Sequence, residues 1–258
     1  MNLNIKDQLF IVCGATSGFG LATLKNLIVD EAKVIAIARG NEKLMDLQKQ
    51  YPKLIEPFCA DITKSETITA LQNKIGNRKL SGVFINAGGP PAMKTLETKL
   101  ADWDNAYQQL LRWKVELTQA LVPLMIQENY GRMVFLESSS VKQPIDNLVL
   151  STSLRLSVVG FVKTLSQEIA ESGVCMNILA PGYHETPAIN RLLEKKAEQD
   201  NISVEQAKSN IASGIRMKKM GNPEDLGQLA AWLLSPASGY ISGQTISLDG
   251  GQILGIHG

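Results

Sequence analysis

The strongest constraint on the fold is a regular alternation of short apolar runs with longer amphipathic stretches along the whole chain. Short runs rich in β-branched residues are typical of strands buried on both faces, and the amphipathic stretches are typical of helices that cover a sheet. The pattern predicts a parallel sheet with helices on both faces. The expected strands are Leu9–Cys13, Lys33–Ala38, Leu54–Ala60, Gly82–Asn86, Arg132–Glu137, Val174–Leu179 and Gln244–Leu248.

Six helical stretches are expected between these strands. Start signals precede several of them, such as Asn222-Pro223-Glu224 before the last, and Pro123 should kink or shorten the long fourth one. No composition shift, repeat or low-complexity tract divides residues 1–258, so we expect one domain. The expected helices are Gly18–Val29, Asn41–Gln50, Lys64–Lys74, Thr98–Glu128, Ser151–Glu171 and Pro223–Leu234.

The segment 187–215 is rich in Glu, Lys, Gln and Asn and separates the sixth strand from the last helix. A solvated helical pair would account for this composition. Ligands of doubly wound sheets bind at the carboxyl edge, where an inserted segment can fold over them. We therefore favour a substrate lid over the helical pair.

Charge and cysteine usage exclude several classes of protein. The 26 Lys and Arg residues nearly balance the 25 Asp and Glu residues, so we expect no nucleic-acid or membrane partner. Cys13, Cys59 and Cys175 are odd in number and lie in or beside apolar runs, which predicts buried thiols in a reducing compartment. The first residues resemble no signal peptide, so a cytoplasmic location is expected. The two histidines lack companion ligands, and we predict no metal site.

Three glycines follow the first expected strand and open the first expected helix, with the spacing GxxxGxG. A glycine permits the tight turn out of the strand, another lets the backbone approach phosphate, and the third lets the helix pack closely on the sheet. A purely structural turn would use the same residues, but the position between strand and helix favours a dinucleotide site. The expected contacts are Gly14, Thr16, Ser17, Gly18, Phe19 and Gly20.

The end of the second expected strand bears on which dinucleotide binds. A carboxylate at this place would accept from a ribose 2′-hydroxyl, whereas the chain has Ala38 followed by Arg39. A small residue leaves room for a 2′-phosphate, and a guanidinium offers it charged hydrogen bonds. Arg39 would equally suit a solvated surface, but the pair favours NADP(H) over NAD(H).

These glycines, together with four later motifs in the right order, make the chain resemble a short-chain dehydrogenase/reductase over nearly its whole length. Each motif alone is unspecific, whereas all five at the expected elements are not. The later motifs are Asp61-Ile62, Asn86-Ala87-Gly88-Gly89, Asn177-Ile178-Leu179-Ala180-Pro181-Gly182 with Thr186, and Gly243-Gln244 with Asp249-Gly250-Gly251.

The resemblance implies a single doubly wound, Rossmann-like α/β domain with about seven parallel strands, often packed as a homotetramer or dimer. It also implies that Asp61 and Ile62 hold the adenine, although Asp61 would serve as a helix N-cap as well. Asn86, Ala87 and Gly88 would line the adenosine ribose. Pro181, Gly182 and Thr186 would cradle the nicotinamide.

The chain departs from the family in its catalytic residues, which are usually Asn, Ser, Tyr and Lys. Alignment by the flanking motifs puts Leu110 on the Asn, Ser138 on the Ser, Ser151 on the Tyr and Arg155 on the Lys. Arg155 keeps a positive charge and can still hold ribose hydroxyls. Ser151 cannot replace the phenol, because an aliphatic hydroxyl is a far weaker acid. The usual proton relay is therefore absent.

Within this site, Ser138 is the expected carbonyl-polarising hydroxyl, although the run Ser138-Ser139-Ser140 permits a shift of register. The segment 139–145 resembles branches of the family that are similar to ketoacyl reductases and share the imperfect tetrad. Those branches do not fix the substrate.

Another residue can be considered as the proton donor, because Tyr183 and His184 directly follow the predicted nicotinamide turn. A histidine has a suitable unperturbed pKa for acid catalysis near neutral pH. The simpler interpretation is a loop residue with no catalytic role.

Two functions remain open. The first is an NADP(H)-dependent oxidoreductase that acts on a carbonyl/alcohol pair of a small-molecule substrate, in the manner of a 3-oxoacyl reductase. The alternative is a catalytically impaired dinucleotide-binding protein with a sensor or assembly role. A homo-oligomer is expected in either case, since the apolar content of 103–124 and 253–256 exceeds what one sheet face needs.

Overall fold

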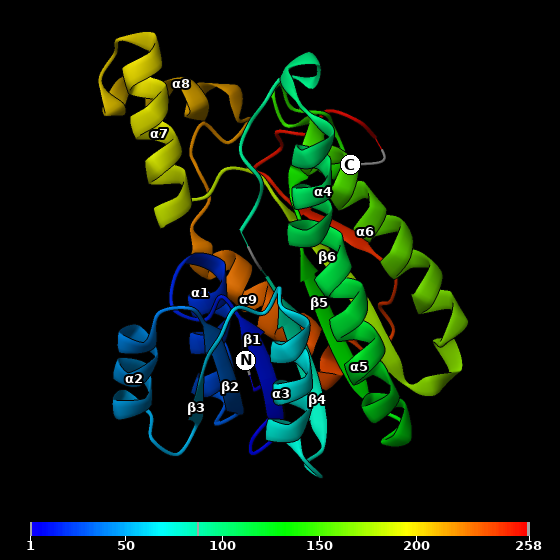
Figure 1. The fold of residues 1–258 in the computed structure, drawn as a ribbon. Helices are drawn as coiled ribbons and strands as arrows, with labels where there is room; N and C mark the ends of the chain where they lie inside the picture. The colour runs from blue at the N-terminus through cyan, green and yellow to red at the C-terminus, as the bar shows by residue number, and fades with distance from the viewer. Residues whose placement is uncertain (1, 87, 257–258) are drawn as a thin grey trace.

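Seven parallel strands form one sheet in the order β3-β2-β1-β4-β5-β6-β7, in a computed structural model that describes residues 2–86 and 88–256 (Figure 1). The sequence-based strands are confirmed, with small differences at their ends. The order reverses between β1 and β4, and in such sheets a crevice for ligands opens at that reversal, on the carboxyl edge. The strands are β1 (Leu9–Cys13), β2 (Lys33–Ala38), β3 (Ile55–Cys59), β4 (Leu80–Ile85), β5 (Gly131–Leu136), β6 (Val174–Pro181) and β7 (Thr245–Leu248).

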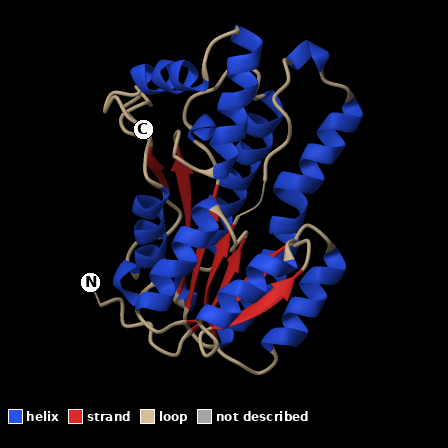
Figure 2. Ribbon diagram, turned by 90° about the vertical axis from the view of Figure 1, so that its left-hand side faces the viewer, coloured by secondary structure: helices blue, strands red, loops and turns tan. Residues whose placement is uncertain are grey.

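Helices cover both faces of the sheet, as the turned view in Figure 2 shows. Helices α1 (Gly18–Val29), α2 (Asn41–Gln50) and α9 (Pro223–Leu234) pack on one face. Helices α3 (Ser65–Ile75), α5 (Trp113–Gln127) and α6 (Val149–Glu168) pack on the other. Successive residues of β1 point to opposite faces, and both sets are apolar, which is why the strand reads as an unbroken apolar run.

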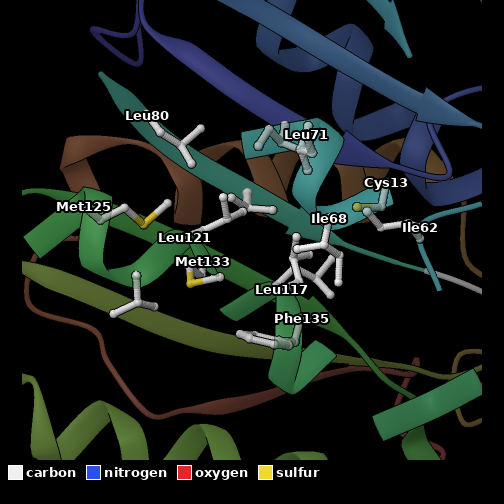
Figure 3. Close-up of a cluster of buried hydrophobic side chains, with 14 of the residues drawn as sticks. Cys13, Ile62, Ile68, Leu71, Leu80, Leu117, Leu121, Met125, Met133 and Phe135 are labelled. Atoms are coloured by element: carbon white, nitrogen blue, oxygen red, sulfur yellow. The ribbon is translucent and has the colours of Figure 1, made fainter. Parts of the chain in front are cut away.

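The core under α3 and α5 is drawn in Figure 3. Leu117 and Leu121 of α5 meet Ile68 and Leu71 of α3 above Phe135 of β5, and all five side chains are almost fully buried. Burying one such side chain contributes about 1.5–3 kcal/mol. These contacts fix α5 on the sheet, and α5 carries a residue of the site.

The expected helix over 98–128 is confirmed over 100–127, but it is not a regular α-helix throughout. A 3₁₀ turn (Thr95–Glu97) and α4 (Leu100–Tyr107) are followed by a π-helical segment at Gln108–Arg112, and only then by α5. The irregularity lies at this segment rather than at Pro123, where α5 continues to Gln127. The wider π turn is accompanied by a hydrogen bond of 2.8 Å from the Trp113 indole Nε1 to the Gln109 carbonyl oxygen.

Helices α7 (Pro187–Asp200) and α8 (Val204–Gly214) stand apart from the helices that flank the sheet (Figure 1). They form the helical pair that the sequence allowed for this segment. The pair has an apolar cluster of its own, formed by Leu193, Ala197, Ala207, Ile215 and Met220.

The thiols differ from expectation at one position. Cys13 and Cys175 are buried, but Cys59 is exposed, because it ends β3, the strand at the edge of the sheet. Its Sγ lies beside the Arg39 carbonyl oxygen. Across residues 2–86 and 88–256, no helix is both long and apolar enough to cross a bilayer. The same residues contain no cluster of three or more His, Cys, Asp or Glu side chains suited to a metal ion.

Candidate active site

The glycine turn after β1 has the geometry that its spacing predicts. Gly14 has a φ of +68°, which favours glycine, and a Cβ there would lie 2.8 Å from Nδ2 of Asn86. A Cβ on Gly20 would lie 2.2 Å from the Gly14 carbonyl oxygen, so α1 approaches the turn as closely as backbone allows. The turn and the close packing of the helix are thus both present, and both depend on missing side chains.

Helix α1 begins at Gly18 with Ser17 at its N-cap, and no side chain caps it. Thr16 is half-buried, Ser17 is exposed, and within the described ranges neither hydroxyl has a recorded hydrogen-bond partner. Unpaired backbone N–H groups at a helix start, together with the helix dipole, attract phosphate. The residues at this edge therefore fit a dinucleotide pyrophosphate.

The ends of β2 and β3 lie side by side, at the part of this edge that is predicted to hold the adenosine. Arg39 is exposed directly after β2 and lies near enough to Asp61 to act on it electrostatically. Oδ1 of Asp61 accepts from the Thr63 backbone N–H (3.0 Å) and hydroxyl (2.8 Å). Burial acts to raise the pKa of Asp61, but these hydrogen bonds and the Arg39 charge hold it below its ordinary value.

The alternative role of Asp61 as a helix N-cap is not what the structure has, because Lys64 stands at the N-cap of α3. The Ile62 side chain is buried in the apolar cluster beneath the edge. After β4, the Asn86 side chain packs on the glycine turn, Ala87 lies outside the described residues, and Gly88 has open space where a Cβ would stand.

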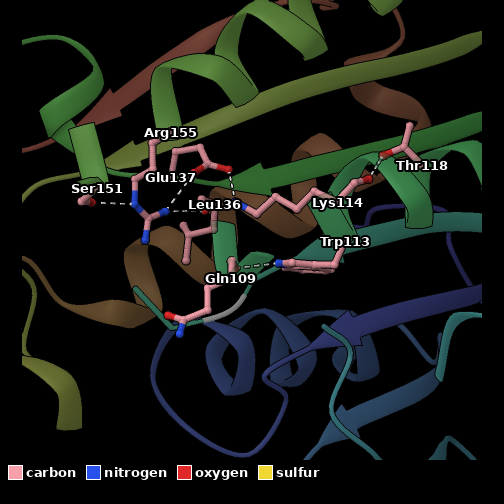
Figure 4. Close-up of polar contacts among 8 residues, drawn as sticks. All are labelled: Gln109, Trp113, Lys114, Thr118, Leu136, Glu137, Ser151 and Arg155. Atoms are coloured by element: carbon pink, nitrogen blue, oxygen red, sulfur yellow. Dashed lines mark hydrogen bonds and ion pairs between the residues drawn. The ribbon is translucent and has the colours of Figure 1, made fainter. Parts of the chain in front are cut away.

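Arg155, at the position aligned with the family's Lys, belongs to a chain of buried charges shown in Figure 4. Glu137 follows β5, and its carboxylate lies between two cations. Oε1 pairs with the Lys114 ammonium from α5, and Oε2 accepts from Nη1 of Arg155, from α6, at 2.9 Å. The exposed fractions of the side chains are 1% for Lys114, 0% for Glu137 and 10% for Arg155. We call these three residues the charge cluster.

Two further contacts fix the Arg155 guanidinium. Its Nε donates to the Ser151 hydroxyl oxygen at 3.1 Å, and Nη1 also lies 3.4 Å from the Leu136 carbonyl oxygen. The structure thus brings together Ser151 and Arg155, the residues aligned with the family's Tyr and Lys. Leu110, aligned with the Asn, is 1% exposed and offers no polar atom to anchor water.

The protonation of the charge cluster follows from its burial. Burial lowers the pKa of Lys114, and the Arg155 charge adds to that effect, while the Glu137 carboxylate opposes it. The same ammonium acts to lower the pKa of the Cys13 thiol at the end of β1, but burial outweighs it and raises that pKa to about 12. The Glu137 carboxylate compensates both cations, and removing it would leave two buried positive charges without an anion.

Ser138, directly after Glu137, is half-buried, and its Oγ accepts from the Ser140 backbone N–H at 3.1 Å. The hydroxyl proton remains free to donate, so Ser138 can still polarise a carbonyl. Ser139 and Ser140 are buried, with exposed fractions of 2% and 1%, which favours Ser138 as the serine that a substrate would meet.

Tyr183 and His184 lie in the turn after β6, where Pro181 pairs with Leu248 and the Gly182 N–H donates to the Leu248 carbonyl oxygen. The His184 ring is buried edge-on against Phe19, with centroids 5.1 Å apart, and Nδ1 lies 3.1 Å from the Gly182 carbonyl oxygen. Burial lowers the pKa of His184 and raises that of Tyr183, so both are neutral near pH 7. Their surroundings favour the packing interpretation over proton transfer.

The base of the α7–α8 pair touches the glycine turn. The Thr186 hydroxyl oxygen caps α7 by accepting from the Ile189 N–H at 3.4 Å, and a Cβ on Gly18 would lie 3.6 Å from Thr186. Backbone hydrogen bonds of 2.9 Å also join Glu185 and Tyr183 to Gly221 on the far side of the pair. The segment predicted as a lid is therefore anchored next to the predicted pyrophosphate site.

Two polar residues of the site were missed at the sequence level, Lys114 and Glu137. Lys114 was identifiable as a charge within the apolar spacing Leu110, Trp113, Leu117 of a core-facing helix. Glu137 resembled the polar end of a strand. Neither residue indicates the other in the sequence, since Lys114 lies on α5 and Glu137 follows β5.

Comparison with known proteins agrees with this architecture. The family model described as enoyl-(acyl carrier protein) reductase matches residues 14–252. The chain belongs to this family of short-chain dehydrogenases/reductases. It is 27% identical over 257 residues to a 3-oxoacyl-[acyl-carrier-protein] reductase of Thermotoga maritima, covering 98% of this chain and all of that one. Its homologues are named as reductases and dehydrogenases, and the chain is accordingly an oxidoreductase that binds a dinucleotide.

Two further relatives carry the name of a cofactor. An NADPH-dependent reductase of Bacillus subtilis is 25% identical over 252 residues, covering 95% of this chain and 97% of that protein. A solved structure of an actinorhodin polyketide ketoreductase with NADPH superposes with a TM-score of 0.89 at 25% identity, covering 95% and 97% of the two chains.

Proposed function

We propose that the protein is an NADP(H)-dependent reductase of a small-molecule carbonyl, with a 3-oxoacyl thioester as the leading substrate class. The observation that carries the cofactor half is the uncapped start of α1 inside a glycine turn, with Arg39 in place of a carboxylate after β2. The relatives named for NADPH and for 3-oxoacyl reduction support the same assignment.

In the proposed reaction, the bound nicotinamide supplies a hydride to the carbonyl carbon, and the carbonyl oxygen takes up a proton. The Ser138 hydroxyl donates a hydrogen bond to that oxygen, and Arg155 holds the nicotinamide ribose through the N–H groups that face outward. Ser151 cannot act as the general acid that the family's tyrosine provides, so the proton comes from another residue or from solvent. Losing such a general acid costs about 10²- to 10⁴-fold in rate, which predicts slow turnover of ordinary ketones.

The hypothesis that Tyr183 or His184 has taken over proton transfer keeps one supporting feature, their place beside the Pro181–Gly182 turn. Steady-state rates of the variants His184→Ala and Tyr183→Phe test it. If both variants turn over at the wild-type rate, neither residue donates the proton and solvent is the source.

We also propose that α7 and α8 act as a lid over the substrate. Their separate apolar cluster would let them move as a unit, and their base meets the glycine turn through Phe19 and Thr186. Hydrogen exchange of 187–214 with and without NADPH tests this proposal. A lid should become more protected in the complex, whereas a fixed helical pair should not change.

A homo-oligomer in the cytoplasm completes the proposal. Most of the apolar side chains between Trp113 and Leu121 belong to the core, but Leu96, Leu100, Leu254 and Ile256 are exposed, which leaves apolar surface at α4 and near the C-terminus. Light scattering coupled to size-exclusion chromatography would report a dimer or tetramer, and a monomer would contradict this part of the proposal.

The decisive experiment mixes the protein with NADPH and a panel of 3-oxoacyl thioesters, ketones, quinones and activated alkenes, and follows the nicotinamide absorbance. Consumption with a thioester supports the proposed substrate class. Tight NADPH binding without consumption across the panel would instead support a dinucleotide-binding protein with a sensor or assembly role, which the replaced residues Leu110, Ser151 and Arg155 would then explain.

A further inference from the structure

Lys114 and Glu137 of the charge cluster have no part in the proposed reaction, although burying them is costly. The cluster has two cations and one anion, and its net charge is therefore one positive unit when Lys114 is protonated. Among the ion pairs of residues 2–86 and 88–256, no other charged side chain joins it. An uncompensated charge of this kind needs either solvent or a ligand to stabilise it.

The orientation of Arg155 determines where that charge emerges. Its Nε and Nη1 are directed inward, to Ser151, Glu137 and the Leu136 carbonyl oxygen. Nη2 has no recorded hydrogen bond within the described part of the chain, and it would lie 3.3 Å from a Cβ on Gly89. Arg155 is also the one cluster residue whose side chain reaches solvent. The free edge of the guanidinium therefore faces the Gly88–Gly89 loop.

That loop lies on the second half of the dinucleotide site. The sheet order reverses between β1 and β4, and a dinucleotide lies across this point with one nucleotide on each side. The glycine turn after β1 takes the pyrophosphate, and β2 and β3 lie on the adenosine side. Glu137 directly follows β5, which lies across the reversal from β2 and β3, so the cluster lies on the side expected to hold the nicotinamide.

We propose that the charge cluster biases the protein toward the reduced cofactor, a proposal that rests on the proposed NADP(H) function. The nicotinamide ring is neutral in NADPH and carries a positive charge in NADP⁺. A fixed net positive charge below it raises the free energy of the oxidised complex and leaves that of the reduced complex nearly unchanged. The charges of Glu137 and Arg155 cancel, so the excess charge is that of the protonated Lys114 paired with Glu137. Glu137 is a positioning residue that holds Arg155.

The cluster acts through charge rather than proton transfer. A guanidinium stays protonated at any pH at which the protein is folded, so a proton passed from Lys114 to Glu137 could go no further toward the substrate. A charge that stays in place can instead change the relative affinity of the protein for NADP⁺ and NADPH. Because NADPH is stabilised relative to NADP⁺, the potential of the bound cofactor rises and bound NADPH becomes a weaker hydride donor. The gain lies in exchange, since spent NADP⁺ is released and replaced by NADPH more readily.

The size of the effect follows from Coulomb's law. For two unit charges in a medium with an effective dielectric constant near 20, a separation of about 12 Å corresponds to about a tenfold change in relative affinity, and to about threefold once salt screening is included. A tenfold change in the ratio of the two dissociation constants shifts the two-electron potential of the bound cofactor by about 30 mV.

The test measures the dissociation constants of NADP⁺ and NADPH by titration without substrate. In Lys114→Met the cluster is neutral, and we expect the ratio of the NADP⁺ constant to the NADPH constant to fall by about threefold to tenfold. In Lys114→Met/Glu137→Gln the cluster regains one positive charge through Arg155, and the ratio should return to the wild-type value. If the single substitution acted by damaging the structure, the ratio in the double variant would instead lie further from the wild-type value than the ratio in the single variant.

Thr118→Val is the matched control, since Thr118 is buried one turn further along α5 and donates to the Lys114 carbonyl oxygen without carrying charge. Its ratio should equal that of the wild type. Urea unfolding of each variant confirms that it is folded under the titration conditions. If the single variant keeps the wild-type ratio, or the double variant fails to recover it, the inference is overturned. If the wild type binds neither nucleotide, the proposed function itself fails.

Discussion

The two halves of the sheet edge are constructed in different ways. At β1 the site depends on missing side chains, because Gly14 and Gly20 leave room for close backbone contact. At β5 it depends on added charge, because Glu137 holds two cations in the interior. The first half can be damaged by adding a single methyl group, and the second by removing a single charge.

The halves also differ in how they relate to stability. Close packing of backbone groups contributes to folding directly. A buried ion cluster is weak evidence for stability, since apolar residues of the same volume would often serve as well or better. A cluster of this kind that includes Arg155, the residue aligned with the family's Lys, is therefore more readily explained by the proposed function than by folding.

The largest effect is expected from Glu137→Leu. Lys114 and Arg155 would be left buried without an anion, and the free energy of unfolding should fall by about 3–5 kcal/mol. Urea denaturation measures the loss. Glu116→Leu is the control, because Glu116 is only partly buried and accepts one hydrogen bond, from Ser65. This substitution should lower the free energy of unfolding by no more than about 1.5 kcal/mol.

The triple variant Lys114→Met/Glu137→Leu/Arg155→Met sharpens the same point. Replacing a whole buried cluster by apolar residues is often neutral or stabilising, so this protein should be more stable than the single Glu137 variant. Greater loss in the triple variant would show that the cluster stabilises the fold, and the contrast between the two halves would disappear.

The next effect is expected at the glycine turn. In Gly20→Ala the new Cβ would meet the Gly14 carbonyl oxygen at 2.2 Å, and neither backbone can yield without moving α1, so we expect a loss of about 1–3 kcal/mol. Gly160→Ala is the matched control. Gly160 is also helical but has open space around it, so the same substitution should stabilise the protein by about 0.5–1 kcal/mol. If thermal unfolding showed that both substitutions stabilise the protein, or that both destabilise it, this reasoning would be refuted.

This contrast explains what the sequence could predict. The strands and the glycine turn follow from local patterns, since the residues from Leu9 to Gly20 contain both the strand and the turn it needs. Parallel pairing then requires the carboxyl ends to share one edge, so the cofactor site follows from the fold. The position of the π segment was not accessible in this way, because a π turn changes the helical period only locally.

The charge cluster was inaccessible for a different reason. Its members come from α5, the end of β5 and α6, and each taken alone has an ordinary explanation in sequence. Arg155 was recognised because a motif marks its position, whereas no motif marks Lys114 or Glu137. Only tertiary packing shows that the three side chains meet. Cys59 illustrates the same limit, since an apolar neighbourhood in sequence did not bury its thiol.

A smaller effect is expected where the α7–α8 pair meets the glycine turn. Thr186→Ala removes the oxygen that caps α7 and should destabilise that helix by about 1 kcal/mol. Thr186→Ser keeps the oxygen and should behave as the wild type. Hydrogen exchange of 187–200 is the measurement, because the cap acts on α7 before it affects the whole fold. Unchanged exchange in the alanine variant would show that the α7–α8 pair is held by its own apolar cluster instead.

The smallest effect is a dependence of stability on pH at His184. Burial lowers its pKa below 6.5, while the Gly182 carbonyl oxygen and the Asp225 carboxylate oppose that shift only in part. The unfolded chain therefore binds a proton more readily, and the stability associated with neutral His184 is present above pH 6.5 and lost as the pH falls through the folded pKa. In urea unfolding, wild type and His184→Asn should thus differ most above pH 6.5, and the difference should shrink as the pH falls below 6.5. Tyr183→Phe retains the histidine and should keep the wild-type slope. A constant difference between wild type and His184→Asn at every pH would mean that the ring contributes by packing on Phe19 alone. The contact between the base of the α7–α8 pair and the glycine turn would then be insensitive to protonation.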